Sequence, residues 1–579
     1  MQKRTINILL WAFGGLVYLY ILIRCFTLEP FIDEIWNFHL YVKTGDYNPF
    51  TAHLDANNHF ISTFLNRLSF LIFGDNFIAM RLVESAFFIL FFNYLMKIRS
   101  IMKNKKLGAF LVLTLCSIFF INSFFSLARG YGISLALLTG AIFHLIEYAN
   151  HFKLKDILFI SVFGSLAIWS NLAFIPIIGL VFLLGILISI QNKDFKSIFL
   201  LILIGGIPYF AGAIHALELK AAGELYIGGK TGFYSDVILN LPNELLGFEG
   251  VWMFLVWGFL TGIFIFLNLK KISWNKNSGI ILILFISTLF SAILMHVFMG
   301  INYPQNRVAI HFILLGVLSF YFLLDMGEKF WIVGVYPFTI FLLHSLTHFN
   351  FSYSAPWQQN VLMRNDITII ENEQRNQEEL FTLSSPFSFK SYVHYFNYDN
   401  PFRMNVPQWK DFPSETADYL ITTYNQAGVN QGLYDTVYTN PISGVTIFER
   451  SEKVLWKPLA NIQVPPISSR DSLISILKLD LQPESNMMKV SYTGNLQTND
   501  EAAIGFLVIN ISNEAEVFGE EFIMLDRYFN NFSAYRQLEI AHYFNKLPKE
   551  TIDVEVYLLN ISRSEWNLED FKISLSQTN

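Results

Sequence analysis

Long apolar runs dominate the first 349 residues of the chain. About 20 consecutive apolar residues are needed to cross the hydrocarbon core of a bilayer. Runs of that kind occupy 6–26, 78–96, 107–126, 130–149, 198–217, 251–268, 279–298, 307–324 and 331–348. The first run follows Lys3 and Arg4, lacks a small-residue cleavage site after it and is followed by further runs. We therefore interpret it as a retained membrane helix and not as a removed signal peptide.

The stretch 157–190 is too long for one ordinary membrane helix and short for two. A split at Trp169-Ser170-Asn171 gives eleven membrane helices in all. With a cytoplasmic N-terminus, this count satisfies the positive-inside rule, whereas one helix over 157–190 would place several basic loops outside. The cytoplasmic basic residues would be Lys97, Arg99, Lys103, Lys105, Lys106, Lys153, Lys155, Lys193, Lys196, Lys270, Lys271, Lys276 and Lys329. The tail after residue 349 would then lie outside the cytoplasm.

The tail, from residue 350 onward, is polar and acidic and has no long apolar run. Short apolar runs separated by turn residues predict strands. They lie at 419–422, 444–448, 473–481, 488–492, 504–509 and 552–559. We predict three parts: a helical membrane domain over 1–349, an extracytoplasmic mixed α/β region over 350–455, and a β-sandwich over 456–579. By fold analogy alone, the sandwich is of a carbohydrate-binding kind.

Composition narrows the class of protein. Of the 579 residues, 53% are hydrophobic and 15% are charged, whereas soluble domains are about 45–50% apolar and about 25% charged. This balance excludes a disordered chain, a coiled coil and an ordinary soluble enzyme. The net charge of −6 and the absence of a long Lys/Arg run argue against a nucleic-acid partner. Cys25 and Cys116 lie in apolar runs and indicate neither a disulfide nor a metal site.

The first outer loop, 27–77, carries two adjacent carboxylates, Asp33 and Glu34. A carboxylate in a partly dry cleft at the membrane face can take a proton from a hydroxyl or amine nucleophile. The plain alternative is a solvated acidic pair just beyond a helix end. The loop is about 50 residues long, which is uncommon for a loop without a function, and its aromatic residues suggest short helices at the interface. Within it, His59 is a candidate hydrogen-bonding residue or simply an interfacial polar residue.

Two arginines lie at outer ends of predicted membrane helices. Arg129 precedes the fourth helix and Arg307 begins the tenth. Outer ends are expected to be poor in arginine, and bidentate binding of a phosphate is one reason to keep a guanidinium there. The alternative is that each side chain extends to lipid headgroups. Two such sites on the same side as Asp33 favour the functional interpretation.

Taken as a set, these motifs resemble the GT-C superfamily of polyprenyl-phosphate-sugar-dependent glycosyltransferases, above all the protein O-mannosyltransferase and aminoarabinose-transferase group. The resemblance covers residues 1 to about 350. It depends on Asp33-Glu34, Phe73-Gly74 followed by Arg81-Leu82, Ala128-Arg129-Gly130-Tyr131, and Asn306-Arg307. Two departures exist: Asn57-Asn58-His59-Phe60 replaces a Lys/His-Pro-Pro-Leu segment, and Arg307-Val308 replaces Arg-Tyr.

The resemblance implies transfer of a hexosyl or pentosyl group from a polyprenyl-phosphate donor to a glycan, lipid or protein acceptor, with inversion at the anomeric carbon. Asp33 would be the general base and Glu34 would orient the acceptor. Arg129 and Arg307 would bind the donor phosphate, and the substrate-binding residues would be Asn58, His59 and Arg81. The protein would be a multi-pass protein of the cell inner (plasma) membrane, in contact with its lipids. Nothing visible requires a cofactor, although a divalent metal is compatible with the pattern.

Two other functions stay open at this point. A lipid-linked-sugar flippase or transporter would place polar residues near the membrane midplane and show paired repeats, whereas here they cluster at one face and no repeat is apparent. A membrane-anchored surface protein without catalysis would not need eleven helices.

Overall fold

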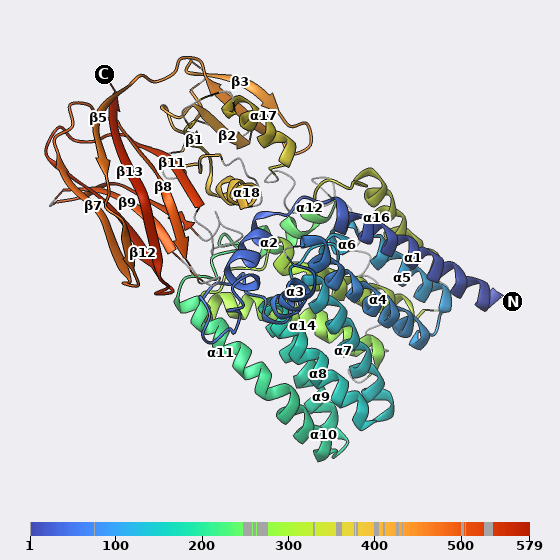
Figure 1. Cartoon of the computed structure of the whole chain (residues 1–579). Coiled ribbons are helices and arrows are strands. Elements are labelled where there is room, and N and C mark those ends of the chain that lie inside the picture. The colour runs from blue at the N-terminus through green and yellow to red at the C-terminus, as the bar shows by residue number, and fades with distance from the viewer. Residues whose placement is uncertain are drawn as a thin grey trace. The chain divides into compact units, whose positions relative to one another are not determined.

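The computed structural model describes residues 2–578 except 75, 247–257, 259–261, 263–275, 328–329, 355–361, 376, 378–379, 399–403, 409–411, 424–427, 431, 499–502, 504, 514 and 526–535 (Figure 1). Residue contacts divide the chain into two compact units. The membrane unit comprises Met1–Leu28 and Asp46–Pro356, and the tail unit comprises Glu29–Gly45 and Trp357–Asn579. The segment 29–45 of the first loop thus folds with the tail.

Helices make up the membrane unit. Seven helical stretches are long and apolar enough to cross a bilayer. They are α1 (Gln2–Thr27), α4 (Phe77–Ile101), α7 (Tyr131–His151), η2 with α9 (Leu172–Phe174 and Ile175–Gln191), α10 to α11 (Phe195–Leu200 through Ile207–Ala221), α14 (Asn277–Met299), and η6 with α15 (Asn306–Ala309 and Ile310–Leu324). Shorter helices are α3 (Phe60–Phe73), α5 (Lys105–Ser117), α6 (Phe119–Phe124), α8 (Leu154–Ser170), α12 (Asn240–Leu246) and α16 (Val335–Thr347). The chain is a multi-pass membrane protein.

Ten of the eleven predicted membrane segments contain a helix whose bounds the structure describes. In the segment 251–268 the described residues are Gly258 and Gly262, both helical, and Lys270, Lys271 and Lys329 fall outside the described residues. The predicted split of 157–190 is present: α8 ends at Ser170, and Asn171, which has an extended backbone, caps the next helix because its side-chain Oδ1 accepts the Ala173 backbone N–H at 3.0 Å. The predicted helix over 107–126 is in fact two helices, α5 and α6, because Ile118 between them is extended.

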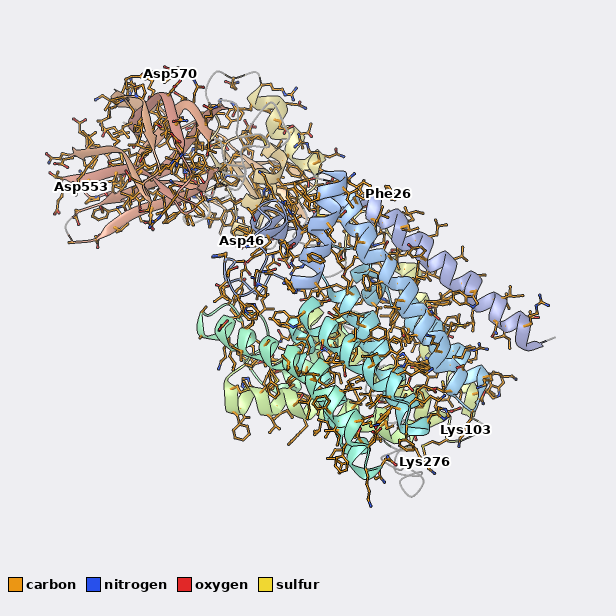
Figure 2. The ribbon with its side chains drawn as sticks, turned by 60° about the horizontal axis from the view of Figure 1, so that its bottom comes forward. Phe26, Asp46, Lys103, Lys276, Asp553 and Asp570 are labelled. Carbon is orange, nitrogen blue, oxygen red and sulfur yellow. The ribbon has the colours of Figure 1, made fainter. Side chains whose placement is uncertain are left out.

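One end of the membrane unit gathers the basic loops. The carboxylate of Asp325, at the end of α15, accepts the backbone N–H groups of Lys103 and Asn104 at 2.8 and 2.7 Å. Figure 2 shows Lys103 and Lys276 at this end of the membrane unit, and Phe26 and Asp46 at the other. This separation of charge is the one that the positive-inside rule describes.

Arg129 and Arg307 lie away from this basic end. Arg307 precedes Asp325 by 18 residues of mostly helical chain, which at 1.5 Å per residue is about 27 Å. Arg129 precedes α7, whose last turn meets the first turn of α14 through a 3.0 Å hydrogen bond from Asn150 to Asn277. Both arginines therefore belong to the end at which Phe26 and Asp46 lie.

The tail unit begins with a mixed α/β part. Its sheet has the order β1-β2-β4-β3, made of Leu383–Ser384, Tyr419–Thr423, Val445–Arg450 and Tyr434–Thr439. The helices of this part are α17 (Arg364–Gln374) and α18 (Phe387–Tyr398). The segment 29–45 contributes α2 (Ile32–Asn37) and the following turn η1 (Phe38–Val42), and α2 packs against α18.

Two further sheets form the end of the tail unit (Figure 1). One has the order β10-β9-β12-β7 (Val517–Met524, Gly505–Ser512, Ile552–Asn560, Leu473–Leu481) and the other β11-β8-β13-β5 (Arg536–Phe544, Met488–Thr498, Trp566–Thr578, Trp456–Gln463), with β6 (Ile467–Ser469) beside β13. Alternate residues of β12 are buried, and both sheets contribute to one apolar core that includes Val490, Ile509, Val556 and Ile573. The predicted order, a helical membrane part followed by a β-rich part, is confirmed.

The two ends of the membrane unit give a test of its orientation. Asp46 and Lys276 are exposed at opposite ends. We expect Asp46→Cys, in a chain that also carries Cys25→Ser and Cys116→Ser, to react with a membrane-impermeant maleimide on intact cells. Lys276→Cys should react only after permeabilisation. The reverse labelling pattern would show that the basic loops face outward.

Candidate active site

His59 lies within electrostatic range of both outer arginines. It precedes α3, is 8% exposed, and its ring meets the ring of Tyr131 edge-on with centroids 5.4 Å apart. Burial lowers the pKa of His59 well below its ordinary value, and the positive charges of Arg129 and Arg307 lower it further. His59 is therefore a neutral imidazole within electrostatic range of two guanidinium groups. We call these three residues the cationic cluster.

The turn that carries Arg129 requires glycine at position 130. Gly130 has φ +71°, in the left-handed region, and a Cβ there would lie 2.2 Å from the backbone oxygen of Ser170. The same Cβ would be 3.1 Å from that of Ser62 and 3.3 Å from that of His59. The close approach of this turn to α3 and to the end of α8 thus brings Arg129 to His59.

Glu84, on α4, fixes the same turn. It is 1% exposed on α4 and accepts the backbone N–H of Ile133 at 3.3 Å. The N–H groups of Gly130 and Gly132 also point to its carboxylate, and Arg129 lies within electrostatic range. The free N–H groups at a helix N-terminus need acceptors, and the side-chain oxygens of Glu84 supply them. Glu84 therefore fixes the start of α7. Asn57 accepts a hydrogen bond from Arg129, so the two residues together fix the position of the guanidinium.

Polar atoms beside the cationic cluster are available to a ligand. Asn58 is 6% exposed and donates from its amide to the carbonyl of Tyr47 at 3.0 Å. The Asn58 Oδ1, His59 Nε2 and Ser62 Oγ atoms are buried and have no hydrogen-bond partner among the described residues. A buried polar atom without a hydrogen bond destabilises the folded protein by about 1–3 kcal/mol. These atoms therefore favour a polar group of a ligand as their neighbour.

Arg81 has contacts of another kind. It is 1% exposed on α4 and donates to the backbone oxygen of Leu28, at the end of α1, at 2.6 Å. Nearby, the fully buried Arg24 donates to the backbone oxygens of Asn350 and Tyr353, each at 3.0 Å. The two arginines thus tie the outer end of α1 to α4 and to the chain that follows α16.

The acidic pair belongs to the tail unit. Asp33 is half-buried and Glu34 is 2% exposed on α2. The carboxylate of Glu34 accepts the backbone N–H of Phe31 at 3.4 Å, so it caps the helix to which it belongs. Tyr392, on α18, is fully buried and lies within electrostatic range of both carboxylates.

The structure thus forms two groups from the predicted residues. His59, Arg129 and Arg307, with Asn58, lie together in the membrane unit, whereas Asp33 and Glu34 lie with Tyr392 in the tail unit. Sequence reasoning missed Glu84 and Tyr392. An acidic residue inside an apolar run was the available signal for Glu84, while nothing in the sequence distinguishes Tyr392 from the aromatic residues around it. Among the described residues, no three His, Cys, Asp or Glu side chains form a group that could hold a metal ion.

Fold and site together define a multi-pass membrane protein with a cationic cluster at one membrane face and a β-rich tail. No protein-family model and no curated protein match the chain. Crystal structures of ArnT from Cupriavidus metallidurans, in the apo state and bound to undecaprenyl phosphate, are each 12% identical to it, with TM-scores of 0.38 and 0.39. They cover 77% and 76% of this chain and 98% and 97% of their own.

A further similar structure is that of the arabinosyltransferase EmbB from Mycobacterium smegmatis. It is 10% identical with a TM-score of 0.32, and the match covers 98% of this chain and 64% of EmbB. ArnT and EmbB are GT-C glycosyltransferases, the superfamily that the sequence motifs resemble.

Gly130→Ala tests the turn that carries Arg129. We expect this variant to be less stable, because a left-handed backbone costs a residue with a Cβ about 1–2 kcal/mol and the contact with Ser170 adds overpacking of about 1–3 kcal/mol. Gly300→Ala is the matched control, since Gly300 is also in the left-handed region, with φ +62° and ψ 27°, but has open space around its Cβ. Thermal unfolding of the purified variants should show the larger loss for Gly130→Ala. Equal losses would contradict the close approach.

Proposed function

We propose that the protein is a membrane glycosyltransferase that moves a sugar from a polyprenyl-phosphate donor to an acceptor outside the cytoplasm. The observation that carries the proposal is the cationic cluster: two guanidinium groups and a neutral imidazole, held at the end of the membrane unit opposite the lysine-rich loops. A lipid phosphate presents its charge at this depth while its chain stays among the helices. The other candidate ligands of a paired arginine site, such as a free carboxylate, have no such reason to lie at the membrane face.

The leaving group of the reaction explains the charge of the site. When the bond between the anomeric carbon and the phosphate oxygen breaks, its electron pair stays on the polyprenyl phosphate, which gains negative charge. Arg129 and Arg307 stabilise that charge in a partly dry site, where such interactions are strongest. Neutral His59 adds a hydrogen bond without adding repulsion between three cations, and Asn58 binds the substrate beside it.

Asp33 is the proposed base. Its carboxylate takes the proton of the acceptor hydroxyl as that oxygen attacks the anomeric carbon from the face opposite the phosphate. The products are an inverted glycoside, a polyprenyl phosphate and a protonated Asp33. Glu34 keeps α2 formed through its contact with the Phe31 backbone, and in this proposal it also orients the acceptor. The acceptor is a glycan, a lipid or a protein.

The proposal also gives a role to Arg81 and a location to the protein. Arg81 serves the substrate by fixing the outer end of α1 at Leu28, from which the chain continues to the acidic pair. The membrane is the cell inner membrane, with the tail unit outside the cytoplasm, and the domain boundaries near residues 349 and 455 stay predictions. A flippase would also bind the lipid phosphate, but it would not need Asp33 as a base.

Replacing Arg307 tests the phosphate site. We expect Arg307→Gln to weaken binding of undecaprenyl phosphate to the purified protein at least tenfold, because one of two guanidinium groups is lost. Arg99→Gln is the matched control: Arg99 lies on α4 near the basic end, where it donates to Asn7 at 2.6 Å. Equal affinity of the Arg307 variant and the wild type would remove Arg307 from the site.

Replacing Asp33 separates an enzyme from a flippase. Asp33→Asn should lower sugar transfer from a panel of polyprenyl-phosphate sugars by a factor of 10² or more, since general base catalysis contributes about 10²–10⁴, while binding of undecaprenyl phosphate is unchanged. Asp46→Asn, in the same loop and exposed, is the control. Mass analysis of the products gives the rate. Full transfer by Asp33→Asn would show that another group takes the proton.

A further inference from the structure

A loop that follows α11 lies along the part of the chain that leads to Arg307. We call residues 226–236 of this loop the outer strap. The backbones of Gly229 and Tyr303 exchange two hydrogen bonds, each 2.9 Å long, as antiparallel strands do. The outer strap therefore runs beside residues 302–305, which directly precede the turn that carries Arg307.

Asp236 closes the outer strap and links it to this segment. It is 6% exposed, and its Oδ2 accepts the backbone N–H groups of Thr231 and Gly232 at 2.8 and 2.9 Å. Its Oδ1 accepts the hydroxyl of Thr231 at 2.6 Å and the side-chain amide of Gln305 at 3.1 Å. A Cβ on Gly229 would overlap the carboxylate of Asp236, so the outer strap needs glycine at the place where it closes.

α14 and the outer strap hold the same segment at further points. His296, on α14, stacks on Tyr303 with ring centroids 4.1 Å apart, and its Nδ1 donates to the backbone oxygen of Ile301 at 3.0 Å. The side-chain amide of Asn302 donates to the backbone oxygen of Tyr226 at 2.8 Å. The chain before Arg307 is therefore fixed by side-chain contacts as well as by the backbone pair.

The turn into Arg307 depends on the contacts that hold its flanks. Asn306 has φ +53°, in the left-handed region that residues with a Cβ seldom adopt. Such a residue persists only where the surrounding structure fixes it. Gln305 is extended and forms the N-cap of η6, in which Arg307 is the second residue. The hydrogen bond from Gln305 to Asp236 thus fixes the chain one residue before the strained position and two before Arg307.

We propose that Asp236 is a positioning residue for the donor phosphate: by holding the outer strap to Gln305, it fixes the turn that presents Arg307. This inference rests on the proposed function, in which Arg307 binds the lipid phosphate. Asp236 then has for Arg307 the role that Glu84 has for Arg129, since each carboxylate accepts N–H groups of the chain beside its arginine.

Asp236→Asn tests this role, because the amide has the size of the carboxylate but only one acceptor oxygen. We expect the affinity for undecaprenyl phosphate to fall about tenfold, the loss expected for one hydrogen bond to a charged group, while the affinity for undecaprenol is unchanged. Asp194→Asn is the matched control. Asp194 caps α10 by accepting the backbone N–H and the hydroxyl of Ser197, and it follows Lys193 in one of the lysine-rich loops. The same change there should lower stability without lowering the affinity for undecaprenyl phosphate.

Amide hydrogen exchange over 302–308 gives a second readout that needs no lipid. Exchange there should become faster in Asp236→Asn and unchanged in Asp194→Asn. Gln305→Met removes only the 3.1 Å link to Asp236, and it should give the same faster exchange and a loss of affinity in the same direction, even if Asp236→Asn does not fold.

Wild-type affinity for undecaprenyl phosphate in Asp236→Asn and Gln305→Met would overturn the inference. If the wild type itself binds undecaprenyl phosphate and undecaprenol equally, the proposed phosphate site fails. Faster exchange over 302–308 in the two variants would then still support the hold of the outer strap on the turn before Arg307.

Discussion

Two positive charges held together in a largely buried place are the constraint on which the account of this protein depends. Like charges repel, and burial, which is nearly complete for Arg129 and partial for Arg307, deprives them of solvation. The histidine within electrostatic range of both is neutral, Asn57 accepts a hydrogen bond from Arg129, and Glu84 accepts the backbone N–H of Ile133 at the start of α7. A phosphate would complete this balance, because its charge is opposite and its oxygens match the geometry of guanidinium groups.

The rest of the membrane unit serves to keep that cluster in place. Gly130 allows the turn before α7 to approach α3 and the end of α8. At the opposite end, the hydrogen bonds of Asp325 hold the end of α15 to the loop after α4. Arg307, at the other end of the same helix, is thereby kept far from the lysine-rich loops. The tail unit fixes the helix that carries the acidic pair in a similar way. Glu34 caps α2, and α18 packs against α2.

Sequence reasoning found the features that leave a local signal. The break at Asn171, the strands of the tail and the order of helical and β-rich parts follow from hydrophobic pattern and turn chemistry. The outer arginines were found because their residue type is unusual at that place. What sequence reasoning missed depends on contacts between distant segments: the partnership of Glu84 with α7, and the folding of residues 29–45 onto α18. Ile118 breaks a run of apolar residues without a proline or glycine to mark it, so the pattern predicted one helix where there are two.

The contrast between a charged and an uncharged lipid with the same chain tests the central claim most directly. Binding of undecaprenyl phosphate and of undecaprenol to the purified protein should be compared, with the double variant Arg129→Gln, Arg307→Gln alongside. The wild type is predicted to prefer the phosphate at least 100-fold, in line with about 2.7–4 kcal/mol for one oxyanion-stabilising group, and the double variant is predicted to lose that preference. Equal binding of both lipids by the wild type would contradict a phosphate site at Arg129 and Arg307.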